Sequence, residues 1–131
     1  MSDWMNEKLK TRSVQIGLGV LSGAAFALLA YLLMGLPEGP PPLFPHQDKL
    51  LHFVAFAGVT APAALALPGR YLLFWVAHMS LVAVGTEFFQ GLVYADRTAS
   101  PWDALADLLG IGLALAVCVP VRRIVLSRSA A

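Results

Sequence analysis

Long apolar stretches alternate with short polar ones along the whole chain. A membrane-spanning helix needs about 20 predominantly apolar residues, because the hydrocarbon core of a bilayer is about 30 Å thick. The pattern therefore predicts a single-domain, all-α membrane protein, residues 1–131, folded as an up-and-down bundle of four transmembrane helices. The expected spans are residues 14–36, about 50–67, about 71–94 and about 102–121.

The first apolar stretch follows several basic residues, as the apolar part of a secretory signal peptide does. It is 23 residues long, whereas the apolar region of a signal peptide has about 7–15 residues. We therefore expect this stretch to be a membrane span that stays in the mature protein and not a cleaved signal peptide. The second stretch contains Pro62, which is expected to bend it, and Pro120 is expected to end the fourth.

Small residues recur at helical spacing within three of the apolar stretches. Such stripes let neighbouring helix backbones approach closely inside a membrane. We therefore expect close helix packing along three faces. They are marked by Gly19, Gly23 and Ala27, by Ser80 and Ala83, and by Gly110 and Ala114.

Composition supports a membrane protein. Hydrophobic residues make up 58% of the chain and charged residues only 13%, against about 25% charged residues in a typical soluble domain. The basic residues are scattered, so nucleic acid is not an expected partner. The single Cys118 cannot form a disulfide within the chain, and no tight motif of metal ligands is present. The sequence therefore predicts no metal site and no cofactor.

Charge is distributed unequally between the two ends of the expected bundle. The end that holds both termini carries seven basic and two acidic residues, and the opposite end carries two basic and six acidic residues. Basic loops stay on the cytoplasmic side of a membrane. The distribution therefore predicts that both termini are cytoplasmic and that the acidic end lies at the outer face.

Three of the expected spans carry polar side chains at this acidic end. Asp48 and His52 lie one helical turn apart at the start of the second span, and Glu87 and Gln90 lie one turn apart near the end of the third. Ionised groups near the hydrocarbon layer are costly unless they are paired or hydrated. We therefore expect these side chains to turn toward one another. The predicted ligand-binding cluster consists of Asp48, Lys49, His52, Glu87, Gln90, Arg97, Asp103 and Asp107.

Glu87 is the acid for which burial matters most. It lies 17 residues beyond Arg70, about 25 Å along a helix that starts on the inner side. We expect Lys49 or Arg97 to pair with it, since a buried acid needs a positive neighbour. Two other acids have simpler explanations: Asp48 as a helix N-cap, and Asp103 as part of a capping box with Ser100.

Several motifs of this chain resemble those of the VanZ-like family of small bacterial membrane proteins. The family pattern is Asp-Lys-x-x-His, then Glu-x-x-Gln, then an arginine followed by Asp-x-x-x-Asn-x-x-Gly. Asp107 stands where the family usually has asparagine. The matching residues, which cover spans two to four in the same order, are Asp48, Lys49, His52, Glu87, Gln90, Arg97, Asp103 and Gly110.

The resemblance implies a multi-pass protein of the bacterial cytoplasmic (inner) membrane with a role in the cell envelope. The founding member of the family is associated with resistance to the lipoglycopeptide antibiotic teicoplanin. Three functions stay open for this chain. The favoured one is non-enzymatic: the cluster binds a membrane lipid or another amphiphile, such as a glycopeptide, by its head group, with Lys49 and Arg97 contacting an anionic group. The others are an intramembrane acid–base or metal-assisted enzyme, and a purely structural subunit of a membrane assembly or oligomer.

Overall fold

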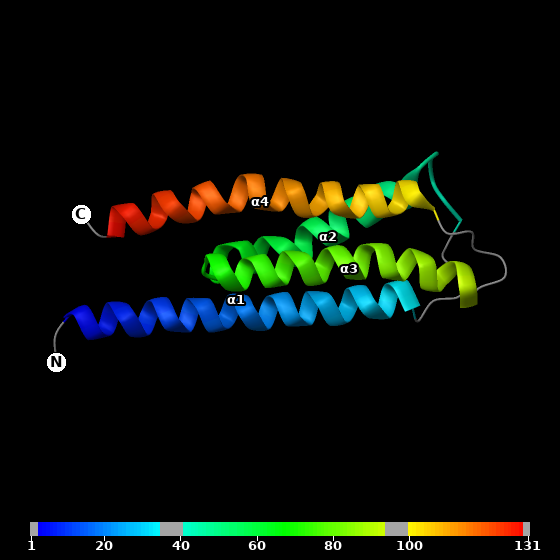
Figure 1. Ribbon diagram of the computed structural model, residues 1–131. Coiled ribbons are helices and arrows are strands. Elements are labelled where there is room, and N and C mark those ends of the chain that lie inside the picture. The colour runs from blue at the N-terminus through cyan, green and yellow to red at the C-terminus, as the bar shows by residue number, and fades with distance from the viewer. Residues whose placement is uncertain (1–2, 35–40, 94–99, 130–131) are drawn as a thin grey trace.

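The computed structural model describes residues 3–34, 41–93 and 100–129, and all the regular secondary structure of these residues is α-helical. Each helix contains a segment long and apolar enough to cross a membrane, which confirms the predicted number and order of the spans. The four helices are α1 (Asp3–Met34), α2 (Gln47–Ala66), α3 (Gly69–Val93) and α4 (Pro101–Ser129) (Figure 1).

Two helices are longer than their apolar stretches. Helix α1 begins at Asp3, well before the predicted start at residue 14, and α4 continues to Ser129. The prediction that Pro120 ends the fourth helix is wrong, because this proline lies inside α4. A proline removes one backbone donor, and a helix can continue when its surroundings tolerate that loss. The apolar pattern marks the part of a helix suited to a bilayer, and the polar ends of the helix lie beyond it.

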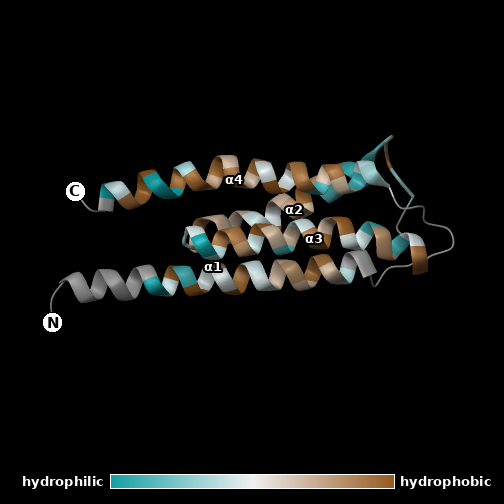
Figure 2. Ribbon diagram, in the orientation of Figure 1, coloured by the Kyte–Doolittle hydropathy of each residue, from teal (hydrophilic) through white to brown (hydrophobic). Residues whose placement is uncertain are grey.

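Helix α2 occupies the centre of the bundle. It packs most extensively against α4, then against α1, and to a smaller extent against α3. Both termini lie at one end of the bundle, together with the turn between α2 and α3 (Figure 1). The starts of α2 and α4 and the end of α3 lie at the opposite end, which we call the polar end. Hydrophilic residues gather there on α2 and α4 (Figure 2).

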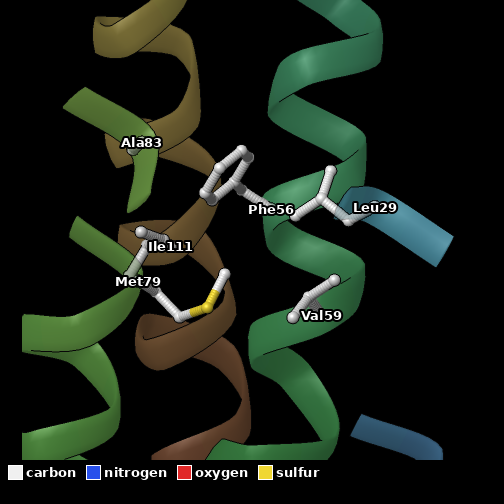
Figure 3. Close-up of a cluster of buried hydrophobic side chains, with 6 residues drawn as sticks. All are labelled: Leu29, Phe56, Val59, Met79, Ala83 and Ile111. Carbon is white, nitrogen blue, oxygen red and sulfur yellow. The ribbon is translucent and has the colours of Figure 1, made fainter. Parts of the chain in front are cut away.

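A compact cluster of apolar side chains fills the middle of the bundle (Figure 3). Every helix contributes to it, so the cluster holds the helices in one arrangement. Phe56, Met79 and Ala83 are completely buried. Dispersion contacts between such closely packed groups stabilise helix association even where lipid replaces water. Its buried members are Leu29, Phe56, Val59, Met79, Ala83 and Ile111.

Helices α2 and α4 approach each other closely at Gly110. A Cβ atom at this position would lie 3.1 Å from the backbone nitrogen of Ala57 and 3.1 Å from the carbonyl carbon of Phe53, and it would collide with the Phe53 carbonyl oxygen. Only glycine fits here, since backbone atoms cannot move aside as a flexible side chain can. The prediction of close packing along Gly110 and Ala114 is therefore confirmed, and Ala114 is also buried.

Helix α1 packs through a different face from the one that its glycines mark. A Cβ atom at Gly19 or Gly23 would meet nothing within 4 Å, so the prediction of close packing there is wrong. Between residues 12 and 31 of α1, the buried residues are instead Ser22 and Leu29. The Ser22 hydroxyl donates a hydrogen bond to the Val59 carbonyl of α2 at 3.1 Å. Spacing identifies a possible contact face, but the neighbouring helix decides which face it covers.

Candidate functional site

The polar end brings together side chains from the first turns of α2 and α4 and from the last turns of α3. This convergence follows from the chain direction, because α2 and α4 start where α3 finishes (Figure 1). Seven of the eight predicted site residues fall within the described part of the chain, and Arg97 lies outside it. The N-cap residue of α2 is His46, with a left-handed backbone (φ 62°). The interpretation of Asp48 as the N-cap is therefore wrong.

The most deeply buried contact of the site joins α2 to α4. Nδ1 of His52 lies 2.9 Å from Oδ1 of Asp107, a hydrogen-bond distance. Asp107 is completely buried and His52 is partly buried. Asp107 and Gly110 lie three residues apart on the same face of α4. The tight helix approach at Gly110 and the His52–Asp107 contact therefore belong to one interface.

Glu87 links the end of α3 to the start of α4 and also approaches α2. Its Oε2 atom accepts a hydrogen bond from the Ser100 backbone N–H at 3.2 Å, and its Oε1 atom lies 3.8 Å from Nδ1 of His52. Glu87 is buried, as the sequence predicts for an acid that faces the bundle interior. In a capping box, the Asp103 side chain would accept a hydrogen bond from the Ser100 N–H. This N–H bonds to Glu87 instead, so the capping-box interpretation of Asp103 is wrong.

Lys49 pairs with two other acids at a shallower level. Its Nζ atom lies 2.9 Å from Oδ2 of Asp48 and 3.0 Å from Oδ1 of Asp103. The second contact is an ion pair without hydrogen-bond alignment, since Oδ1 of Asp103 has no hydrogen-bond partner among the described residues. Among the described residues, the basic neighbour of Glu87 is therefore His52 and not Lys49, while the alternative partner Arg97 lies outside them.

The site therefore has two parts. We call His52, Glu87 and Asp107 the buried triad, and Asp48, Lys49 and Asp103 the rim group. One ligand atom from each member of the buried triad lies within 4.8 Å of the corresponding atoms of the other two, a separation at which three groups can share one metal ion. Gln90 is also buried, one turn beyond Glu87 on α3.

An open pocket of about 420 Å³ lies between α3 and α4, and Glu87 of the buried triad is part of its wall. Its wall is apolar except at Glu87 and Ser100, so it offers one acidic group beside a hydrophobic surface. The sequence did not reveal this pocket, because its existence depends on the separation of two helices. The residues that line it are Val84, Glu87, Phe88, Ser100, Pro101, Ala104, Leu105 and Leu108.

No family model, curated protein or solved structure matches this chain. The chemistry of the site is therefore interpreted from its own residues. The similarity of their spacing to the VanZ-like pattern stays a prediction. The arrangement can hold a cation between its acids, accept hydrogen bonds from a head group, or lock three helices together.

Proposed function

We propose that this chain is a multi-pass membrane protein that binds the head group of an amphiphilic molecule at the polar end. The pocket between α3 and α4 supports this proposal, because an apolar wall there adjoins a buried acid. Ligand sites commonly combine an apolar lining with a few polar groups that fix the orientation of the ligand. The apolar chain of the ligand lies along Phe88 and Leu108, and its head group reaches Glu87.

The charges of the described cluster favour a head group that donates hydrogen bonds or carries positive charge. Lys49 already contacts two carboxylates, so it is not the free cation that an anionic head group requires. Glu87 lines the pocket, and its Oε2 atom accepts one hydrogen bond, from the Ser100 N–H, so this oxygen can accept a second. An amine such as that of an ethanolamine phospholipid complements this oxygen, since charge-assisted hydrogen bonds are the strongest kind.

The VanZ-like motifs support the same position for the site. Asp48, His52, Glu87 and Asp103, which carry the resemblance, all belong to the polar end. We therefore propose a VanZ-like role at the bacterial cytoplasmic membrane, in the handling of an envelope lipid or a similar amphiphile. Both termini are cytoplasmic and the polar end faces outward, as the basic residues at the other end favour.

Lipid binding tests the proposed function directly. The full chain is purified in detergent and titrated with fluorescent phosphatidylethanolamine. A separate titration uses phosphatidylglycerol with the same acyl chains, which has no amine in its head group. We expect tighter binding of the ethanolamine lipid. Ala104→Leu fills the pocket without replacing a residue of the buried triad, and it should weaken binding about tenfold, equivalent to about 1.4 kcal/mol.

Ala116→Leu is the matched control, since Ala116 lies on the same helix, is exposed and does not line the pocket. It should bind the ethanolamine lipid as the unsubstituted chain does. Equal binding by the Ala104→Leu and Ala116→Leu variants would contradict the proposal. If neither lipid binds while the helices stay folded, the polar cluster has the structural role instead.

Cysteine labelling in intact cells tests the orientation. In a background with Cys118 replaced by alanine, a cysteine at the highly exposed Leu43 should react with an impermeant thiol reagent. A cysteine at the exposed Arg128, near the end of α4, should react only after the cells are opened. The reverse pattern would put the polar end in the cytoplasm.

A further inference from the structure

We propose that the buried triad of His52, Glu87 and Asp107 binds one divalent metal ion of the zinc type. Each ligand comes from a different helix, and Nδ1 of His52 lies 2.9 Å from Oδ1 of Asp107 and 3.8 Å from Oε1 of Glu87. The three ligand atoms together lie within 4.8 Å of one another. The proposal goes beyond lipid binding and does not depend on it.

Two oxygen atoms of the triad lack partners. Oε1 of Glu87 and Oδ2 of Asp107 are buried and accept no hydrogen bond from any described residue. Asp107 is 0% exposed and Glu87 6%. A buried acceptor without a partner costs about 1–3 kcal/mol, and more when it is charged. The unpartnered oxygens are therefore best explained as ligand positions for a group that the protein itself does not supply.

Charge balance favours a divalent cation as that group. The triad contributes two carboxylates and one imidazole, whereas the nearby Lys49 is taken up by Asp48 and Asp103. Ionised carboxylates at this depth in an apolar bundle are expensive unless they are neutralised. One divalent ion neutralises two carboxylates while His52 binds it as a neutral ligand.

Coordination geometry is compatible with zinc. Zinc binds imidazole nitrogen and carboxylate oxygen at about 2.0–2.2 Å, and in a tetrahedral site two such ligand atoms lie about 3.3–3.6 Å apart. Nδ1 of His52 lies 2.9 Å from Oδ1 of Asp107 and 3.8 Å from Oε1 of Glu87, on either side of this range. The unpartnered Oδ2 of Asp107 belongs to the same carboxylate, so either of its oxygens can bind the ion. Three protein ligands leave one position open, as in catalytic zinc sites. The imidazole favours zinc over magnesium, which prefers oxygen ligands and keeps its waters.

The sequence disfavoured a metal because the three ligands do not form a compact motif. They stand at positions 52, 87 and 107, so only the packing of α2, α3 and α4 brings them together. The competing explanation needs no metal: a protonated His52 sits between the two carboxylates and locks the helices. The two explanations differ in metal content and in which acids matter.

Metal analysis of the full chain in detergent tests the proposal. After purification and dialysis against buffered Zn²⁺, inductively coupled plasma mass spectrometry should find about one zinc ion per chain, as expected for a three-ligand site. Asp107→Asn and Glu87→Gln should lower zinc affinity by more than the roughly 10–100-fold lost when an outer-shell partner is removed. Asp48→Asn and Asp103→Asn are the matched controls, because they remove carboxylates of the rim group only, and they should retain zinc.

X-ray absorption at the zinc edge of the unsubstituted chain keeps the test independent of variant folding. We expect nitrogen and oxygen ligands only, with the signature of one imidazole. A chain that holds no zinc after dialysis would overturn the proposal. Equal zinc content in folded Asp107→Asn and in the control variants would also overturn it, since the zinc would then be an adventitious ion only. A sulfur ligand or two imidazoles would also overturn it. None of these outcomes bears on lipid binding, which the Ala104→Leu variant tests separately.

Discussion

The small-residue stripes of α1 and α4 look alike in sequence but differ in the structure. In α4, Gly110 lies against the backbone of α2, and any side chain there would collide with it. In α1, Gly19 and Gly23 face open space. Regular spacing therefore defines a smooth helix face, and a second feature determines whether another helix covers it.

That second feature is a pair of polar side chains that meet across the interface. Asp107 lies on the same face of α4 as Gly110 and meets His52 of α2 at 2.9 Å. In α1 the buried polar residue three positions after Gly19 is Ser22, whose hydroxyl donates to the backbone carbonyl of Val59 and forms no pair of polar side chains like His52 and Asp107. The comparison suggests that close helix approach in this chain occurs where a small residue and a buried polar pair coincide.

The largest expected effect is at Gly110, and the matching change at Gly23 should have almost none. Gly110→Leu should prevent recovery of folded protein, because α2 and α4 would have to separate and the buried triad would lose its contacts. Gly23→Leu adds the same side chain to a face with no neighbour and should change the free energy of unfolding by less than about 0.5 kcal/mol. Thermal unfolding and gel filtration in detergent measure both. Similar losses for the two variants would remove the distinction between the stripes.

The next effect concerns the polar pair at the α2–α4 interface. Asp107→Leu leaves His52 without its buried partner and should cost about 3–5 kcal/mol. The double variant His52→Leu with Asp107→Leu should cost clearly less than the sum of the single variants, since no polar group is then stranded. A double-mutant cycle by chemical unfolding measures the coupling. Strict additivity would mean that the two side chains do not interact.

A smaller effect is expected at the buried hydrogen bond between Ser22 of α1 and α2. Ser22→Ala removes the hydrogen bond to the Val59 carbonyl of α2. Interhelical hydrogen bonds of this kind contribute about 0.6 kcal/mol on average, and Ser22→Ala should destabilise the protein by about that amount. Ala24→Ser, the reverse change at an exposed position of the same helix, is the comparison variant. A loss above about 2 kcal/mol at Ser22 would give α1 a more central role than its burial indicates.

The smallest effect is expected at the rim group. Lys49 is partly exposed, and exposed ion pairs contribute about 0–1 kcal/mol. Lys49→Met should therefore change stability little. Its effect should also add to that of Glu87→Gln, because Lys49 contacts Asp48 and Asp103 and not Glu87. If Lys49→Met instead restored the stability lost in Glu87→Gln, Lys49 and Glu87 would form the ion pair that the sequence suggested.

Much of the fold was predictable from apolar run length, because a bilayer-spanning helix needs a minimum number of apolar residues. The ends of α1 and α4 were not, since a helix can continue past its apolar segment and through Pro120. The grouping of His52, Glu87 and Asp107 at one end followed from the alternating chain direction. The choice of partners did not, because rotating a helix by one residue about its axis changes which acid meets Lys49 or His52.

Cross-linking measures the meeting of α2, α3 and α4 at the buried triad most directly. In a background without the native cysteine, paired cysteines replace His52 and Asp107, or His52 and Glu87, and membranes are treated with a short bifunctional thiol reagent. Both pairs should cross-link efficiently. Cysteines at Val54 of α2 and Leu109 of α4, which are both exposed, should not. Cross-linking of the control pair without either triad pair would contradict the arrangement of the site.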